Sequence, residues 1–232
     1  MSKHAFPKHR YSHGKQVKGI NLDTFKRMVD KVDKIDLGSY TPLLFKSLLA
    51  LLFWCGIRKT EAHGSRAHRY VLKPCKRHLE PIIKVSEPML GITREDITED
   101  NEWLYVHAVT RKHGSREKET PLPLWKALPF VNLIREQWLK TEPKQRVFPI
   151  SEWDSWNIMK QIDAKKYLHF FRFNRITELC SNPKMSIANI CSWVGLSPQT
   201  INSYMERSGR FTRETAEKMR EQYAYASLEV KP

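Results

Sequence analysis

The chain has 232 residues, of which 41% are hydrophobic and 11% aromatic, a composition typical of a globular protein that buries a substantial core. Its 40 lysines and arginines against 25 aspartates and glutamates give a formal net charge of +15, which favours a polyanionic partner, above all nucleic acid. The four cysteines follow a basic N-terminus without an apolar stretch, which argues against a secreted, disulfide-stabilised protein and favours a cytoplasmic one.

Composition divides the chain into four segments. Residues 1–20 are basic, rich in histidine and poor in apolar side chains, and we expect a flexible arm there. A single N-terminal helix is expected over residues 21–40. The main domain is expected over residues 41–210, followed by a C-terminal helix and tail over residues 211–232.

Helical patterns dominate the first part of the chain. A helix is expected to begin near Asn21, because apolar residues then recur on one face; these are Leu22, Phe25, Met28, Val29, Val32 and Ile35. Thr41 suits the N-cap and Pro42 the first position of a second helix. Residues 43–55 are strongly apolar but include Lys46 and are too short to span a bilayer, so they predict a core helix and no membrane segment.

The middle of the chain predicts a β-hairpin. Residues 64–91 are basic and show no periodic pattern, so we expect a long loop or insertion there. In EWLYVHAV, the residues Leu104, Val106 and Ala108 alternate with Trp, Tyr and His, which is typical of a half-buried strand. A polar turn with a glycine follows, and residues 119–124 predict the returning strand.

The remainder of the chain predicts helices separated by prolines and a glycine. They are expected near residues 124–140, 152–163, 170–181, 186–194, 198–206 and 212–226. The predicted fold class is therefore mainly α with a small antiparallel β-sheet, that is, α+β.

A basic protein that binds nucleic acid can also cut it. Cleavage of a phosphodiester without a metal needs cations on the non-bridging oxygens, an in-line nucleophile, and an acid that protonates the leaving oxygen. Guanidinium groups suit the first task, because they offer a fixed fork of donors and stay charged. A phenol, whose pKa is about 10, needs such positive surroundings to attack as phenolate.

Three segments carry these residue types in a distinctive order. LLALLFWCGIRKTEAHG holds Arg58 and Glu61 after an apolar helix, and HFFRFNRITELC holds His169 and Arg172 at the start of another. Tyr204 lies further along, in NSYMERSG. The first two segments resemble the two arginine boxes of the tyrosine recombinases, or phage integrases, and Tyr204 follows at a spacing close to that of the family's nucleophile.

The hairpin between the two boxes also resembles the family's lysine-bearing β-hairpin. In VTRKHGSREKETPLP, Lys112 occupies the matching place, with Lys118 as the second choice. The resemblance covers about residues 41–207 and implies the fold of the tyrosine recombinase catalytic domain. We expect the family's usual N-terminal DNA-binding domain to be missing here or reduced to residues 21–40.

The resemblance implies a division of labour. Tyr204 would attack the scissile phosphate and form a 3′-phosphotyrosyl link with a free 5′-hydroxyl. Arg58 and Arg172 would hold the non-bridging oxygens. Lys112 would protonate the departing oxygen, and His169 would help to move the proton of the nucleophile. No cofactor or metal is needed, because the covalent link stores the energy of the broken bond.

Two further positions bear on this expectation. The resemblance implies that Glu61 orients the site without touching the phosphate. Leu196 stands where the family has a His or Trp that donates a hydrogen bond, and a leucine cannot donate one. Trp193 lies nearby, but we expect its indole in the core.

Taken as a whole, the resemblance implies DNA recombination or integration. The expected protein is a site-specific recombinase that acts on double-stranded DNA as a homo-oligomer, a tetramer on DNA, and that comes from a mobile element. Strand exchange between two duplexes requires several active sites, which is the reason to expect an oligomer.

Other interpretations remain open. SIANICSWVGLSPQTINSYM is typical of a helix-turn-helix, with Gly195 in the turn, so the chain can be a non-catalytic DNA-binding protein. A type IB topoisomerase-like nicking-closing enzyme uses similar chemistry on one strand. A zinc site is a weaker alternative; its residues would be His63, His68, Cys75 and His78. Other candidate nucleophiles are Tyr167, Tyr223 and Tyr225.

Overall fold

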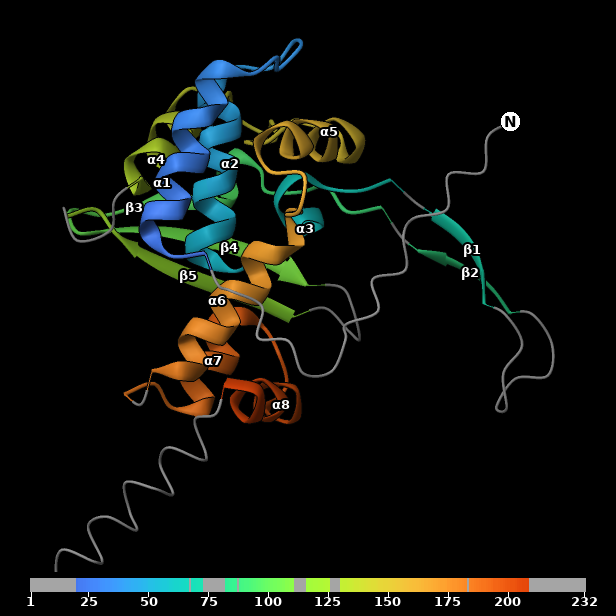
Figure 1. Ribbon diagram of the computed structural model, residues 1–232, viewed down its shortest axis with the longest axis vertical. Coiled ribbons are helices and arrows are strands. Elements are labelled where there is room, and N and C mark those ends of the chain that lie inside the picture. Colours follow the sequence, from blue (N-terminus) through green and yellow to red (C-terminus); the bar gives the residue numbers. More distant parts are fainter. Residues whose placement is uncertain are drawn as a thin grey trace, which may run out of the picture.

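The protein is mainly α-helical with a small antiparallel sheet, as predicted (Figure 1). The computed structural model describes residues 20–66, 68–72, 82–86, 88–110, 116–125, 130–182 and 184–208. Its helices are α1 (Leu22–Lys31), α2 (Pro42–Cys55), α3 (Lys59–His63), α4 (Val131–Leu139), α5 (Glu152–Ile162), α6 (His169–Ser181), α7 (Ile187–Val194) and α8 (Pro198–Ser208). Its strands are β1 (His68–Leu72), β2 (Ile82–Ser86), β3 (Ile97–Glu99), β4 (Trp103–Thr110) and β5 (Arg116–Pro123).

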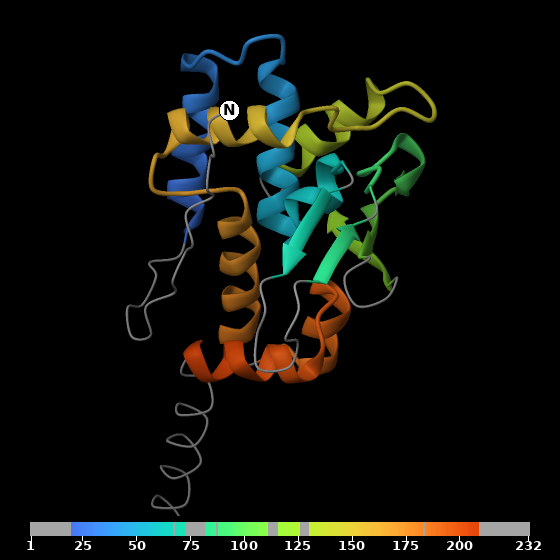
Figure 2. The same ribbon diagram turned by 90° about the vertical axis from the view of Figure 1, so that its right-hand side faces the viewer.

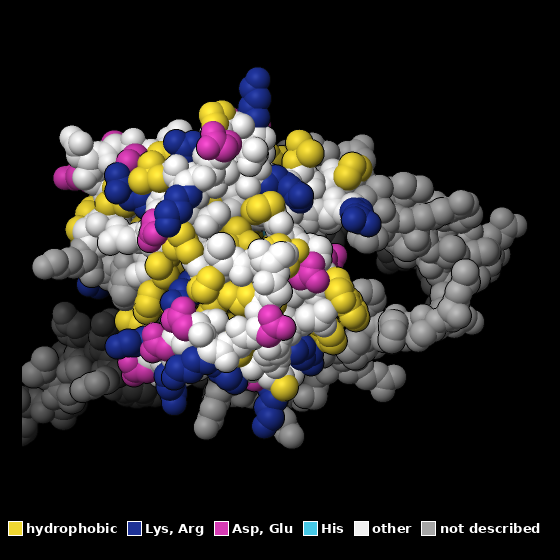
Figure 3. All heavy atoms as spheres, turned by 90° about the horizontal axis from the view of Figure 1, so that it is seen from above, with side chains coloured by type: hydrophobic (Ala, Val, Ile, Leu, Met, Phe, Trp, Pro, Cys, Tyr) yellow, Lys and Arg dark blue, Asp and Glu magenta, His cyan; other side chains and the backbone are white. Residues whose placement is uncertain are grey.

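The helices form two groups joined by α6. Helices α1, α2, α4 and α5 lie on one side of the β3–β4–β5 sheet, and α6 leads from them to α7 and α8 (Figures 1 and 2). Seen from the α1–α2 end, the surface mixes basic, acidic and hydrophobic side chains (Figure 3). Among the described residues, no helix is both long enough and apolar enough to cross a bilayer.

Local signals in the sequence fix the starts of α1 and α2 near the expected positions, whereas α1, expected over residues 21–40, ends at Lys31. The side chain of Asn21 accepts a hydrogen bond from the backbone N–H of Thr24, and that of Thr41 accepts one from Leu44. Pro42 occupies the first turn of α2. This helix ends at Gly56, whose φ of +59° places it in the left-handed region that favours glycine.

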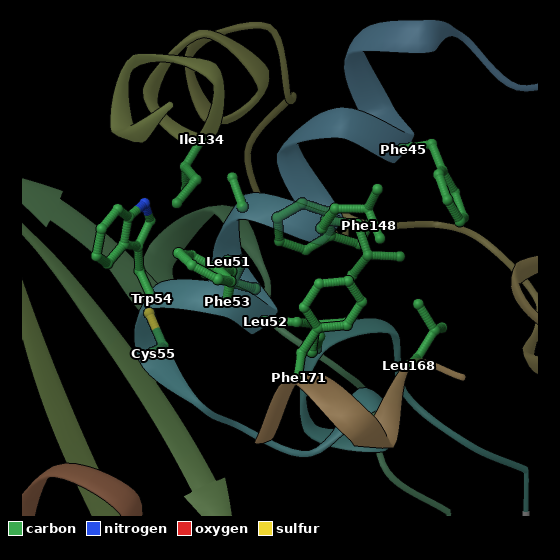
Figure 4. Close-up of a cluster of buried hydrophobic side chains, with 14 of the residues drawn as sticks. Phe45, Leu51, Leu52, Phe53, Trp54, Cys55, Ile134, Phe148, Leu168 and Phe171 are labelled. Atoms are coloured by element: carbon green, nitrogen blue, oxygen red, sulfur yellow. The ribbon is translucent and has the colours of Figure 1, made fainter. Parts of the chain in front are cut away.

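Helix α2 is the centre of the main core, because nearly all of its side chains are buried. Figure 4 shows Leu51, Leu52 and Phe53 of α2 beside Phe148 and beside Phe171 of α6. Phe25 of α1 stacks on Phe53, with the ring centroids 4.2 Å apart. Helix α1 therefore shares one core with the residues that follow it.

The β3–β4–β5 sheet is antiparallel throughout, with β4 in the middle. Along β4 the predicted alternation is confirmed, since Leu104, Val106 and Ala108 are buried. On β5 the buried positions are Lys118, Thr120 and Leu122, and Ala108 pairs with Lys118 across the hairpin. One face of the hairpin thus packs into the protein and brings a lysine with it.

A second, smaller core holds α6, α7 and α8 together. Ile190 and Val194 of α7 and Ile201 of α8 are fully buried there. Gly195, with a φ of +63°, ends α7 and permits the tight turn into α8.

Several sequence expectations need correction. Residues 64–91, expected as a patternless loop, contain the antiparallel ribbon of β1 and β2, and β3 was not predicted either. These strands are at most five residues long, too short for a clear alternation. The helix expected from residue 124 begins at Val131. Of the arm expected over residues 1–20, only Ile20 is described, and it is buried rather than part of a flexible arm. The helix expected over residues 212–226 lies outside the described residues.

Gly64 and Gly91 bring two backbone segments into contact, and this contact gives a testable prediction. A Cβ on Gly91, whose φ is +82°, would lie 2.6 Å from the backbone nitrogen of Gly64. We expect Gly91→Ala to lower the free energy of unfolding by about 3 kcal/mol or more in urea titrations, because backbone cannot move aside as a side chain can.

Gly38→Ala is the matched control. Gly38 also has a positive φ, of +62°, but no atom lies within 4 Å of the position that an added methyl group would take. Only the cost of the left-handed backbone applies, about 1 to 2 kcal/mol. Equal losses in the two variants would contradict the close approach of the segments.

Candidate active site

Four of the residues expected in the site come from three parts of the chain. Arg58 precedes α3 and Glu61 lies within it, Arg172 lies in the first turn of α6, and Tyr204 lies on α8. The sequence separates Gly56 and Arg172 by 116 positions, yet the two are hydrogen-bonded. The fold therefore gathers these segments around one point.

The start of α3 explains why an arginine and a glutamate stand three residues apart. Arg58 is the N-cap of α3, and its backbone N–H donates to Glu61 Oε2 over 2.8 Å. The Arg58 guanidinium donates to Glu61 Oε1 over 2.5 Å. The carboxylate thus closes the first turn of the helix and fixes the guanidinium above it.

Glu61 is a buried carboxylate in a positive environment. Only 3% of the residue is exposed, and its Oε2 lies 3.3 Å from Lys118 Nζ. Burial by itself raises the pKa of Glu61, but Lys118, the N–H of Arg58, and the Arg172 and Arg58 guanidiniums outweigh it and bring this pKa to about 2. The side chain is therefore ionised at neutral pH.

Arg172 is anchored by backbone carbonyl groups. Its Nη1 donates to the carbonyl oxygen of Gly56 over 2.7 Å, and its Nη2 donates to that of Val194 over 2.9 Å. Burial and the nearby Arg58 lower the pKa of Arg172 to about 10, against the opposing effects of Glu61 and Tyr204. Arg172 thus remains charged and ties the end of α2 to the end of α7.

Tyr204 is half-buried beside α6. Its ring centroid lies 5.7 Å from that of Phe173, the residue after Arg172. Its phenol is close enough to Arg172 for a phenolate charge to raise the pKa of that guanidinium.

The cluster carries an excess of positive charge. Arg58, Arg172 and Lys118 surround the single carboxylate of Glu61, which leaves two positive charges in excess. Of these cations, Arg58 is the most accessible, with 22% of its side chain exposed. Such a group of cations is suited to an anion with two charged oxygens, such as a phosphodiester in its pentacovalent state.

The other expected site residues belong to the start of α6 and to the β4–β5 hairpin. His169 is the first residue of α6 and is half-buried, one helical turn before Arg172. Lys112 lies outside the described residues. Lys118, the second choice for the hairpin lysine, belongs to the cluster but has only 2% of its side chain exposed.

Leu196 and Trp193 lie beside the cluster without adding a donor to it. Leu196 follows Gly195 and packs against the second core. The indole N–H of Trp193 donates to the carbonyl oxygen of Trp54 over 3.3 Å, and its ring lies 5.4 Å from the Arg175 guanidinium. Trp193 therefore joins α7 to α2, in keeping with the core position expected for it.

The zinc alternative gains no support from the residues that the structure describes. No group of three or more His, Cys, Asp or Glu among them is placed to hold a metal ion. His63 is buried and its Nδ1 lies 2.8 Å from the carbonyl oxygen of Gly64; burial lowers its pKa to about 4. Cys75 and His78 lie outside the described residues.

Comparison with known proteins finds a similarity in fold but none in sequence. The sequence matches no protein-family profile, and no curated protein has a similar sequence. Solved structures with a similar fold include the XerH site-specific recombinase bound to its difH substrate before cleavage, and the same recombinase bound to a palindromic difH substrate after cleavage. The TM-scores are 0.54 and 0.55, at 13% sequence identity in both cases.

The fold of this chain is therefore similar to that of the XerH site-specific recombinase. The alignments cover 82% and 89% of this chain but only 50% and 54% of the recombinase chains. The chain thus spans about half the length of the recombinase chains that it matches. At this level of identity the likeness concerns the fold, so the chemistry has to be argued from the residues of the cluster.

Proposed function

We propose that the protein cleaves and rejoins double-stranded DNA as a site-specific tyrosine recombinase or integrase, through a 3′-phosphotyrosyl link to Tyr204. The observation that carries the proposal is the meeting of Arg58 and Arg172 around Glu61, with the ring of Tyr204 packed against Phe173, the residue after Arg172. A nucleophile next to a cationic anion site is the minimum that metal-free phosphodiester cleavage requires.

In this proposal the two guanidiniums bind the non-bridging oxygens of the scissile phosphate. Two of the five N–H donors of Arg172 are held by backbone carbonyls, which aims the planar group and leaves further donors for a phosphate. Arg58 is oriented by Glu61. Because both groups are held before substrate arrives, little reorganisation is needed as charge develops in the transition state.

Tyr204 supplies the nucleophile. Its oxygen attacks phosphorus, the bond to the 5′-oxygen breaks, and the new phosphotyrosyl ester keeps the energy of the old one. The pKa of a free phenol is about 10, and a guanidinium at close range favours the phenolate. His169, at the start of α6, is proposed to take part in moving the phenol proton, and Lys112 to protonate the departing 5′-oxygen.

The proposed reaction also suggests a role for each segment of the chain and a working oligomer. Residues 41–210 form the proposed catalytic unit, residues 21–40 add an N-terminal helix that shares its core, and residues 1–20 and 211–232 flank it. Exchange between two duplexes needs several active sites, so a homotetramer on DNA is the proposed working form. A mobile element is the proposed origin.

A second candidate function has one observation in its favour. Helices α7 and α8 are joined by the tight turn at Gly195, and α8 exposes the polar side chains of Gln199, Thr200, Asn202 and Ser203. This arrangement suits a helix-turn-helix protein that binds DNA without cutting it. Under that hypothesis, the cluster around Glu61 would be structural.

Covalent capture separates the two functions. Purified protein would be incubated with nicked DNA duplexes whose central segment is randomised, and denatured adducts would then be isolated and sequenced. We expect a DNA–protein adduct of one strand per chain, with the modified peptide containing Tyr204 by mass spectrometry. Sequence-specific binding without any adduct would contradict the proposal and favour the helix-turn-helix hypothesis.

A further inference from the structure

Lys118 is a lysine in a position where a sheet usually carries an apolar residue. It shares the inward face of β5 with Thr120 and Leu122, and 2% of its side chain is exposed. A buried ammonium group loses its hydration, so it is retained only where other groups compensate for the loss. The role of Lys118 therefore depends on the groups that compensate for its burial.

Two acceptors from different helices compensate for the burial of Lys118. Its Nζ lies 3.3 Å from Glu61 Oε2 on α3 and 3.5 Å from the carbonyl oxygen of Val194. Val194 is the last residue of α7, where carbonyl groups lack helical partners and the helix dipole is negative. The same carbonyl accepts the hydrogen bond from Arg172, so two cations meet at the end of α7.

The end of α7 controls the placement of the proposed nucleophile. Three residues, Gly195, Leu196 and Ser197, separate Val194 from α8, which carries Tyr204. A shift of the Val194 carbonyl would therefore move the start of α8. Glu61, in turn, is the residue that holds the Arg58 guanidinium.

We propose that Lys118 is a positioning residue that sets Tyr204 against the two arginines, by bridging the carboxylate of Glu61 to the end of α7. The inference rests on the proposed function. In this role Lys118 acts through Glu61 and Val194, the two acceptors that its ammonium group contacts, rather than by touching the phosphate. The role differs from that of a proton donor, which must reach the leaving oxygen.

The charge of Lys118 is sensitive to pH in the alkaline range. Burial lowers its pKa to about 8, with Arg172 acting in the same direction and Glu61 and Cys55 opposing it. These are the groups that face it from α6, α3 and α2; the fourth neighbour, from α7, is the uncharged Val194 carbonyl. Above this pH the ammonium becomes an amine, and its attraction to the carbonyl and the carboxylate weakens.

Hydrogen exchange tests the bridge without any assay of activity. In Lys118→Met, we expect the amides of α7 and α8 to exchange about tenfold faster, while those of α1 keep their protection. Lys140→Met, at an exposed position directly after α4, is the control and should change neither. Unchanged exchange in α7 and α8 of Lys118→Met would overturn the proposal.

The wild-type protein provides the same test if Lys118→Met does not fold. After correction for the intrinsic pH dependence of exchange, the protection of α8 relative to α1 should fall as the pH rises from neutral through the pKa of Lys118, about 8. Lys118→Arg, which keeps its charge throughout, should show no such fall. Constant relative protection in the wild-type protein would overturn the proposal.

A substrate with a sulfur leaving group distinguishes positioning from proton donation. A duplex recovered from covalent capture would carry a 5′-bridging phosphorothiolate, whose P–S bond breaks when Tyr204 attacks phosphorus. The thiolate leaves without a proton, because thiols have a pKa of about 8.5. The loss of a proton donor is therefore rescued by this substrate, whereas the loss of a positioning residue is not.

We expect Lys118→Met to slow adduct formation about tenfold or more on both the oxygen and the sulfur substrate. Rescue by sulfur to the wild-type rate would overturn the proposal and make Lys118 the proton donor. If wild-type protein forms no adduct with any duplex, the proposed function fails, whereas the exchange experiment still decides whether Lys118 holds α7 and α8.

Discussion

Tyr204→Phe is expected to abolish covalent capture of DNA, with adduct formation reduced about a thousandfold or more. The substitution removes only the attacking oxygen. The ring stays, and with it the packing against Phe173 at a centroid distance of 5.7 Å. Non-covalent DNA binding, measured by gel shift, should therefore remain near the wild-type value.

Tyr105→Phe is the matched control for this experiment. The Tyr105 hydroxyl donates to Asp100 over 2.7 Å, and its strand, β4, presents it on the face opposite to Leu104 and Val106. This variant should form the adduct at the wild-type rate. An adduct that persists in Tyr204→Phe and disappears in Tyr167→Phe would reassign the nucleophile to the residue two positions before α6.

Glu61→Ala is expected to produce the largest loss of stability, about 3 to 5 kcal/mol in the free energy of unfolding. The substitution removes the partner of the enclosed ammonium group of Lys118 and two hydrogen bonds that Arg58 donates. A buried charge left without its counter-ion accounts for most of this cost. Urea titration at neutral pH measures it directly.

Glu61→Gln keeps the size and shape of this side chain but removes its charge, so it isolates the effect of the charge on stability. The folded protein holds the pKa of Glu61 near 2, below its ordinary value of 4.5. A depressed pKa stabilises the fold above pH 4.5, and this contribution, about 3 kcal/mol, is lost as the pH falls from 4.5 toward 2. The glutamine variant has no such dependence.

The difference in unfolding free energy between wild type and Glu61→Gln should therefore shrink as the pH falls below 4.5. Lys118 introduces no change in this range, because its pKa is about 8. A difference that does not shrink as the pH falls from 4.5 toward 2 would show that Glu61 is not held as a carboxylate by the cations around it.

Local signals made much of the fold predictable. The N-caps at Asn21 and Thr41, Pro42, and the glycine that ends α7 each specify a helix end by themselves. The alternation along β4 specifies which face of the hairpin is buried. Such features depend on a few neighbouring residues, so the sequence displays them directly.

Features that depend on distant partners were harder to predict. The short strands β1 and β2 have no extended pattern, and α3 is a helix of five residues whose first turn is closed by Glu61. One feature of the sequence indicates that Lys118 is buried: it stands at alternate positions with Thr120 and Leu122, on the same face of β5. The two cations on the Val194 carbonyl could not be inferred, because nothing in the sequence records which backbone oxygen a side chain reaches.

The hydrogen bond between Gly56 and Arg172 has a consequence for how the protein is made. Its acceptor leaves the ribosome well before its donor, since 116 positions separate them. Contacts between such distant residues form late in folding, after the loop between them has closed. A growing or prematurely terminated chain therefore lacks the assembled cation cluster, and any DNA-cutting activity would arise only once synthesis has passed α8.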